Sequence, residues 1–336
     1  MMESIKPVSR LTDSTRGYAI AVTSAFVFST TAIFIRHLTQ TYHLPALVLA
    51  FWREIIVALT LICVLGLVKP KLLRVGRRHI LFLIFYGLVL AIYNSLWTLS
   101  VALNGAAIST VLVYSSAAFT ALLGWWILNE RLTWSKVTAI ALSLGGCILV
   151  ANALDLAAWR ANLIGILTGI LSGLCYAIYS LMGRSAAQRG LNSWTTLLYI
   201  FGFASIFMLS VNLSPWKAIP GIAMRPSDLF WLGSSVAGWV ILFLLAAGPT
   251  VFGYGLYNMS LGYLPSSTAN LIVTMEPPIT AAIAYILLGE RMNGIQIGGS
   301  LLILAGVVVL RIFEGRGKIN DTSKAINANA KMAESG

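Results

Sequence analysis

Stretches of about 20 apolar residues recur from one end of the chain to the other, separated by short polar segments. At about 1.5 Å of rise per residue, each stretch can cross a bilayer as an α-helix. Helices are the expected element, because lipid offers no partner to the open backbone groups of a sheet edge. The pattern therefore predicts an all-α membrane protein with ten transmembrane helices. Their predicted limits are 17–38, 45–67, 80–103, 106–128, 136–152, 162–184, 193–213, 237–260, 265–288 and 295–313.

Lysine and arginine are distributed unevenly over the segments between these helices. If the N-terminus is cytoplasmic, 17 of them lie on the inner side of the membrane and 5 on the outer side. Basic residues favour the cytoplasmic side. We therefore expect a multi-pass protein of the bacterial inner membrane with both termini in the cytoplasm. A cleaved signal peptide is not expected, because Arg36 follows the first apolar run without a small-residue cleavage site.

The composition agrees with a membrane protein, since 58% of the 336 residues are hydrophobic and 10% are charged. A formal net charge of +12 would suggest nucleic acid as the partner of a soluble protein. Here the basic residues flank apolar segments, which favours contact with membrane lipid and no nucleic-acid partner. The three cysteines lie inside apolar runs without a C-x-x-C pair, and we interpret them as packing residues.

The two halves of the chain resemble each other. "LNERLTWSKVTAIALSLGG" at 128–146 aligns with "LGERMNGIQIGGSLLILAG" at 288–306, which matches Glu130 with Glu290. We expect both glutamates to cap helix ends or to pair with arginine. Each half contains five predicted helices, so the second half enters the membrane from the opposite side. Inverted repeats of this kind are typical of secondary transporters that alternate access to a midplane site.

This repeat divides the chain and makes a functional monomer plausible. The predicted divisions are a cytoplasmic N-terminal segment at 1–16, a first five-helix repeat at 17–152, a periplasmic linker at 153–161, a second five-helix repeat at 162–313 and a disordered cytoplasmic tail at 314–336.

The segment "LPSSTANLIVTMEPPITAAIAYILLGERM" at 264–292 resembles the drug/metabolite transporter superfamily, specifically its ten-helix exporters with two EamA-type repeats. "AFWRE" at 50–54 is similar to the second helix of the first repeat in that family. The aromatic content is most like that of the bacterial aromatic amino-acid exporter branch. The resemblance implies export of amino acids across the inner membrane, and it allows a facilitator without an ion partner. One departure is that "SSAA" at 115–118, the first-half counterpart of "MEPP", has neither glutamate nor proline.

A carboxyl group lies inside the ninth predicted helix, at Glu276. Its position is near the middle of the bilayer, where a charge costs about 2.5–3.5 kcal/mol. Three roles stay open: a structural one that caps the backbone, attraction of the ammonium group of a substrate, and coupling of transport to protons. Pro277 and Pro278 are expected to shape this helix by kinking it or freeing carbonyl groups.

Arg53 lies at a similar depth in the second predicted helix, and it is the candidate that compensates the charge of Glu276. Glu54 follows it about 100° around the helix and is expected to face a different neighbour. An alternative is that Arg53 extends to the outer surface or pairs only with Glu54.

Aromatic and amide side chains inside the predicted helices are candidates for substrate binding. An aromatic box with a few amides suits an apolar or cationic side chain with a polar head group. The alternative is ordinary helix packing, which is the usual role of any single one of them. The candidates are Tyr86, Tyr93, Asn94, Trp97, Tyr114, Tyr176, Tyr179, Tyr254, Tyr257, Asn258 and Asn270, together with Glu276.

Sequence motifs of other function classes are absent. No phosphate loop G-x-x-x-x-G-K-[ST] occurs, so no ATPase partner is implied, and neither H-E-x-x-H nor G-x-S-x-G occurs. We therefore expect no catalytic residue, metal site or cofactor. The inverted repeat and the family resemblance imply a transporter of amino acids and related small metabolites by alternating access rather than an enzyme. The alternative is a proton-coupled exporter of cationic toxic compounds or drugs. A lipid-modifying enzyme and a channel are disfavoured, because no catalytic constellation and no ring of like charges occurs in the predicted helices.

Overall fold

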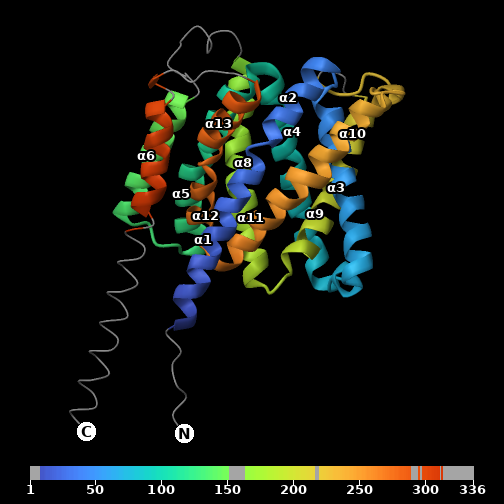
Figure 1. The fold of residues 1–336 in the computed structure, drawn as a ribbon. Helices are drawn as coiled ribbons and strands as arrows, with labels where there is room; N and C mark the ends of the chain where they lie inside the picture. Colours follow the sequence, from blue (N-terminus) through green and yellow to red (C-terminus); the bar gives the residue numbers. More distant parts are fainter. Residues whose placement is uncertain are drawn as a thin grey trace, which may run out of the picture.

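A computed structural model describes residues 8–150, 163–215, 219–288, 294–295, 297–310 and 312. This described part is almost entirely helical and contains no strand (Figure 1). Six helices are long and apolar enough to cross a membrane, which confirms the predicted all-α membrane class at that level. These six are Asp13–Thr41, Ala46–Val68, Arg77–Leu103, Leu163–Gln188, Ser193–Leu213 and Val236–Tyr263. The shorter apolar helices are Leu112–Leu128, Trp134–Leu149 and Ile297–Leu310.

The helices follow one another with short connections. Those before residue 151 are α1 (Val8–Phe28), α2 (Thr31–Thr41), α3 (Ala46–Val68), α4 (Ile80–Tyr114), α5 (Ser116–Leu128) and α6 (Trp134–Val150). Those after residue 162 are α8 (Leu163–Gln188), α9 (Ser193–Leu213), α10 (Val236–Leu245), α11 (Val251–Tyr263), α12 (Ser266–Val273) and α13 (Glu276–Leu288). The connections contain the short turns η1 (Pro70–Leu73), η2 (Arg77–His79) and η3 (Pro226–Phe230).

The first predicted span, at 17–38, lies within the apolar segment Asp13–Thr41, inside which α1 ends and α2 begins around Ser29 and Thr30. The hydroxyl of Ser29 donates to the carbonyl of Phe26 at 2.6 Å, and that of Thr30 to the carbonyl of Val27 at 2.9 Å. Side chains that bond back to the preceding turn compete with the helical ladder and often bend it. Two adjacent hydroxyl residues therefore account for the interruption.

The long helix α4 is not straight. The hydroxyl of Ser100 donates to the hydroxyl of Ser109 at 2.9 Å. In a straight helix, residues nine positions apart would lie about 13 Å from each other. α4 therefore bends sharply between these two serines, but it continues through the boundary predicted between residues 103 and 106 and ends at Tyr114.

The predicted helix at 237–260 contains a wide turn. Between α10 and α11 lies η4 (Ala246–Thr250), a π-type turn that includes Pro249. Proline has no amide hydrogen for the helical ladder. The hydroxyl of Thr250 donates instead to the carbonyl of Leu245 at 2.8 Å. The chain therefore continues from α10 into α11 as a helix only because these five residues change from α-type to π-type hydrogen bonding.

The predicted helix at 265–288 is interrupted completely at Thr274 and Met275, between α12 and α13. Pro277 and Pro278 lie in the first turn of α13, where a missing amide hydrogen costs little. A matching interruption separates α4 from α5 at Ser115, without any proline. The first residue of α13 lies 160 positions after the first residue of α5.

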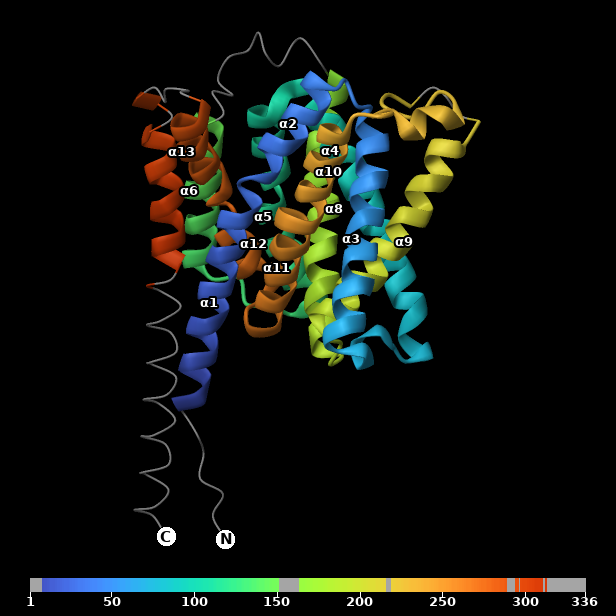
Figure 2. The ribbon, with the colours of Figure 1, turned by 45° about the vertical axis from the view of Figure 1, so that its right-hand side comes forward.

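Helices from the two halves of the chain pack against each other throughout the core. α4 lies along α8, α1 along α11, and α3 along α9. Figure 2 shows α8 and α11 near the middle of the molecule, with α3 and α9 on one side and α6 and α13 on the other. A site in the centre of the bundle would therefore be bordered by α8 and α11.

Candidate functional site

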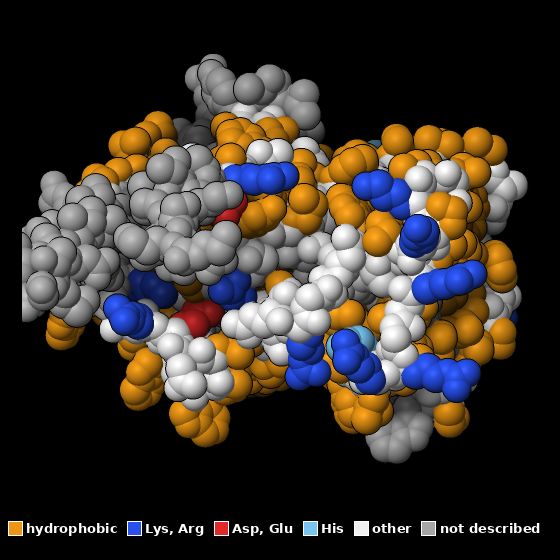
Figure 3. All heavy atoms as spheres, turned by 90° about the horizontal axis from the view of Figure 1, so that it is seen from below, with side chains coloured by type: hydrophobic (Ala, Val, Ile, Leu, Met, Phe, Trp, Pro, Cys, Tyr) orange, Lys and Arg blue, Asp and Glu red, His pale blue; other side chains and the backbone are white. Residues whose placement is uncertain are grey.

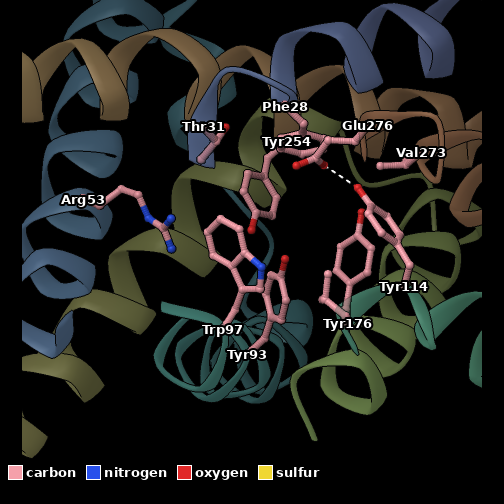
Figure 4. A pocket seen from close by; sticks show the side chains of 11 residues that line it. Phe28, Thr31, Arg53, Tyr93, Trp97, Tyr114, Tyr176, Tyr254, Val273 and Glu276 are labelled. Carbon is pink, nitrogen blue, oxygen red and sulfur yellow. Dashed lines mark hydrogen bonds between the residues drawn. The ribbon is translucent and has the colours of Figure 1, made fainter. Parts of the chain in front are cut away.

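A cavity of about 30 Å³ lies where the three helix interruptions meet. Phe28 and Thr31 flank the break between α1 and α2, Tyr114 ends α4, and Glu276 begins α13 (Figure 4). Because a buried water needs at least about 10–15 Å³, the cavity has room for about two waters. A molecule much larger than two waters would enter it only after the surrounding helices move apart.

Seven of the residues predicted from the sequence line this cavity, and four others line it that the sequence did not single out. The seven are Arg53, Tyr93, Trp97, Tyr114, Tyr176, Tyr254 and Glu276. The four are Phe28, Thr31, Val113 and Val273. Only Thr31 had a usable signal, as the end of the polar run "STT" at 29–31 inside an apolar stretch.

Glu276 is 9% exposed and has a specific neighbour. The hydroxyl of Tyr114 donates to its Oε2 at 2.5 Å. As the first residue of α13, Glu276 also lies at the positive end of the helix dipole. The helix break thus gives the carboxyl group both a donor and a favourable field, while Glu276 still faces the cavity.

Arg53 faces the same cavity from α3 and is 1% exposed. It does not extend to the outer surface. Its guanidinium carbon lies 5.7 Å from the centre of the Trp97 ring. Within the described part of the chain, Nε and Nη2 of Arg53 have no hydrogen-bond partner. The predicted compensation of Glu276 by Arg53 is therefore not a direct contact, because the donor to Glu276 is Tyr114.

Glu54 is fully buried and lies outside the cavity lining. The amide nitrogen Nδ2 of Asn94 donates to its Oε1 at 3.1 Å, and the hydroxyl of Tyr254 donates to Oδ1 of Asn94 at 3.2 Å. The different neighbour expected for Glu54 is thus Asn94. Through Asn94, Glu54 fixes the position of one aromatic wall of the cavity.

Six tyrosines continue from the cavity into the core. Tyr176 stacks on Tyr93 with ring centres 5.0 Å apart, and on Tyr257 at 5.6 Å. Tyr179 lies 4.9 Å from Tyr86 and 5.7 Å from Tyr254, ring centre to ring centre. These six tyrosines therefore form one contiguous cluster, of which Tyr86, Tyr179 and Tyr257 lie outside the cavity lining.

The amide candidates Asn258 and Asn270 lie beneath the cavity rather than in its wall. Asn258 accepts from the hydroxyl of Tyr86 at 3.1 Å and donates to the hydroxyl of Tyr179 at 2.6 Å. Asn270 accepts from the hydroxyl of Ser116 at 3.1 Å. These contacts join the two halves of the chain, so both amides act as structural links in this conformation.

Glu130 lies in the connection after α5 and contacts the first turn of α12. Its carboxylate accepts from the backbone and hydroxyl groups of Ser266 and Ser267, with Oε1 at 2.8 and 2.5 Å and Oε2 at 3.3 and 2.6 Å. Burial raises the pKa of Glu130, but these hydrogen bonds outweigh it and lower the pKa below its usual value. The expected capping role is confirmed for Glu130, whereas Glu290 lies outside the described residues.

Comparison with known proteins identifies the family model that fits the chain. The EamA-like transporter family matches residues 15–152 and again 163–312. A solved structure with 16% sequence identity superposes with a TM-score of 0.69, covering 90% of this chain and 98% of that one. At this identity the superposition concerns the fold alone.

Several curated relatives have names that describe transport. The chain is 24% identical over 277 residues to a probable amino-acid metabolite efflux pump of Salmonella typhimurium LT2, across 80% of this chain and 86% of the relative. It is 28% identical over 252 residues to the threonine/homoserine exporter RhtA of Salmonella typhimurium SL1344, across 74% of this chain and 77% of the relative. A transporter of Synechocystis, sll1319, is 27% identical over 225 residues, which span 67% of this chain and 64% of that protein.

Proposed function

The chain belongs to the EamA-like transporter family, and on that basis we propose that it exports neutral amino acids, aromatic or other, and related small metabolites from the cytoplasm. It is a multi-pass membrane protein and a transporter rather than an enzyme. Relatives named as an amino-acid metabolite efflux pump and as a threonine/homoserine exporter support the substrate class.

The observation that carries this proposal is the chemistry of the cavity. A guanidinium and a carboxyl group face it from different helices, and aromatic rings lie between them. A few polar groups in an otherwise apolar, buried pocket are typical of small-molecule sites. Glu276 is the group that would receive the ammonium of an amino acid, with Tyr114 holding its carboxyl in place.

We further propose ten transmembrane helices in two inverted repeats, 17–152 and 162–313, that alternate access to this cavity. The matching interruptions before α5 and α13, two helices whose first residues lie 160 positions apart, support a repeat. Export as a facilitator requires only that the two repeats move relative to each other around the substrate.

The basic side chains support the proposed orientation. In Figure 3 the molecule is viewed from the end at which α1 begins, and lysine and arginine side chains are spread over that face. The connection between α3 and α4 contributes Lys69, Lys71, Arg74, Arg77 and Arg78, all exposed. By the positive-inside rule, this end is the cytoplasmic one.

A second candidate, proton-coupled export of cationic compounds, is favoured by one feature: a buried acid, Glu276, at the cavity surface. Acidic residues at membrane depth often carry protons in transporters. The two candidates differ in the driving force and in the charge of the cargo, so one experiment separates them.

The test is uptake into inside-out vesicles of threonine, homoserine, phenylalanine and a cationic dye, with and without a pH gradient. We expect uptake of neutral amino acids without a gradient, and a decrease of about tenfold in Glu276→Gln, equivalent to about 1.4 kcal/mol. Vesicles without the protein provide the background. Gradient-dependent accumulation of the dye alone would replace our proposal by the proton-coupled one.

A further inference from the structure

We propose that Arg53 and Thr31 form the binding site for the α-carboxylate of the transported amino acid, so that only cargo with a free carboxylate is recognised with full affinity. This inference rests on the proposed function and assigns one chemical group of the substrate to one end of the cavity.

The first observation is that Arg53 is buried with unused donors. The residue is 1% exposed and lines the cavity, yet its Nε and Nη2 have no hydrogen-bond partner within the described residues. Leaving a buried charged donor unpaired is costly, so such groups are normally paired or hydrogen-bonded. The guanidinium presents its donors in a planar fork that fits a carboxylate with two parallel hydrogen bonds.

The second observation is a hydroxyl group on the same cavity. Oγ1 of Thr31 is buried and has no partner among the described residues, and Thr31 lines the cavity with Arg53. Figure 4 shows Thr31 between Arg53 and Glu276. A hydroxyl can donate one more hydrogen bond to an anion. Two different unsatisfied donors on one small cavity therefore indicate a ligand that supplies acceptor oxygens.

Neither described carboxyl group near Arg53 is hydrogen-bonded to Nε or Nη2 of its guanidinium. Glu276 accepts from Tyr114, and Oε1 of Glu54 accepts from Asn94, while Oε2 of Glu54 is buried outside the cavity lining without a partner among the described residues. Trp97 holds the guanidinium by a ring contact at 5.7 Å, which uses none of its N–H donors. The guanidinium is thus positioned while its unused Nε and Nη2 donors remain available to a ligand.

The arrangement selects a zwitterion. Arg53 and Glu276 lie on different sides of the cavity in Figure 4, with Tyr254 and Trp97 between them. A carboxylate at Arg53 and an ammonium group at Glu276 would each meet a group of opposite charge. An amine without a carboxylate would leave the donors of Arg53 and Thr31 unpaired, which is the feature that lets a site reject such analogues strongly.

The experiment uses four ligands that share one side chain: L-threonine, L-threoninamide, 3-hydroxybutyrate, which keeps only the carboxylate, and 1-amino-2-propanol, which keeps only the ammonium group. Binding to the purified full-length protein is measured by the ligand-induced rise in unfolding temperature and by competition with threonine uptake in inside-out vesicles. We expect threoninamide to bind about tenfold more weakly than threonine, as for the loss of one charged hydrogen-bonded pair.

Variants then assign the effect to residues. In Arg53→Gln, the affinity for threonine should fall about tenfold and should equal the affinity for threoninamide. In Arg53→Lys, part of the preference for threonine over threoninamide should remain. Binding of 3-hydroxybutyrate should depend on Arg53 and not on Glu276, and binding of 1-amino-2-propanol should show the reverse. The matched control is Arg189→Gln, which removes an exposed arginine that lies over Phe82. This variant should change the binding affinity of neither 3-hydroxybutyrate nor 1-amino-2-propanol.

The outcomes separate this inference from the proposed function. Equal binding of threonine and threoninamide to the unmodified protein overturns the carboxylate site, even if amino acids are exported. Arg53-dependent binding of 3-hydroxybutyrate without export of any amino acid keeps the site and overturns the function. If Arg53→Gln does not fold, Thr31→Val provides the second test, and unchanged discrimination in that variant counts against the proposal.

Discussion

At the residue scale, Tyr114 holds the acid of the cavity in place. It is fully buried at the end of α4, and its hydroxyl donates to Glu276 at 2.5 Å. A hydrogen bond to a charged group contributes about 1.5–3 kcal/mol. The orientation of Glu276 therefore depends on one removable oxygen atom.

We predict that Tyr114→Phe lowers amino-acid uptake by about tenfold or more, because the ring still fills its space while the donor to Glu276 is lost. Uptake into inside-out vesicles at equal protein content measures the effect. Tyr199→Phe is the matched control, since the Tyr199 hydroxyl donates to the carbonyl of Leu73 away from the cavity. Equal losses in both variants would point to general destabilisation rather than to the site.

Most aromatic residues of this site could be predicted from the sequence, whereas the hydrogen-bond donors without a partner in the described part of the chain, on Arg53 and Thr31, could not. Tyr93 and Trp97 are four positions apart, a helical spacing that places both on one face, and both line the cavity. Thr31 was not identified, because its role depends on the break after α1 rather than on helical periodicity. The lack of a hydrogen-bond partner for Nε and Nη2 of Arg53 among the described residues could not be predicted either, since charge balance at membrane depth alone favours pairing Arg53 with Glu276.

At the element scale, the two prolines in the first turn of α13 are the obvious explanation for the helix break before it. The matching interruption before α5 follows Ser115 and occurs without proline. At both breaks a hydroxyl bonds back to the preceding turn: Ser115 donates to the carbonyl of Leu112 and Thr274 to that of Leu271, each at 2.6 Å. This shared feature accounts for both interruptions without proline, and the prolines fit the first turn that results.

We predict that Pro277→Ala combined with Pro278→Ala keeps the fold and changes stability by less than about 1 kcal/mol, chiefly through the unfolded chain. Uptake should stay within about twofold of the unmodified protein, a difference below 1.4 kcal/mol. The control is Glu276→Gln, which leaves both prolines in place and removes the charge. A larger loss in the proline variant than in the control would show that the prolines shape the cavity after all.

A second element-scale feature is the cap that Glu130 places on α12. Ser266 and Ser267 both donate backbone and hydroxyl groups to this carboxylate. Since the hydrogen bonds lower the pKa of Glu130 in the folded state, its stabilising effect is present above the ordinary pKa of 4.5 and is lost as the pH falls through the lowered value.

We predict that Glu130→Gln destabilises the first turn of α12 by about 1 kcal/mol, as for other lost helix caps. Hydrogen exchange of the amides at 266–268 should accelerate accordingly at neutral pH. Asp228→Asn is the control, because Asp228 accepts from the backbone of Arg225 in the remote connection before α10. Unchanged hydrogen exchange at 266–268 in Glu130→Gln would mean that other contacts stabilise this turn.

Helix limits were predictable where polar residues flank a uniform apolar run. α9 spans Ser193–Leu213, the limits predicted from the sequence, because Asn192 caps its first turn through Trp194 and Thr195. The break at Ser29–Thr30 was not predicted, whereas a disturbance of the helix was expected near Pro277 and Pro278, directly after the break at Thr274–Met275. Both lie inside apolar stretches whose hydropathy is the same whether the helix is continuous or broken.

At the scale of the whole molecule, the cavity is sealed toward the end at which α1 begins. The hydroxyls of Ser180 and Tyr257 are hydrogen-bonded at 2.6 Å, and Asn270 donates to Ser180 at 3.3 Å. Ser116 extends this chain to α5. Arg16 near the start of α1 lies over Tyr263 at 5.6 Å, at the same end of the bundle. With the proposed orientation, this conformation is closed to the cytoplasm.

The proposed alternating access requires this layer to open in every export cycle, so fixing it should stop transport. Ser116 and Asn270 are its best link, because they lie in different proposed repeats, are fully buried and are joined at 3.1 Å. In a chain whose three native cysteines are replaced, we predict that Ser116→Cys combined with Asn270→Cys loses amino-acid export when mercuric ion bridges the two thiols, and regains it when excess thiol removes the metal. Each single cysteine variant is the control and should respond to neither treatment. Undiminished export by the bridged protein would show that the halves do not separate along this contact, and that substrate leaves the cytoplasm by another route through the bundle.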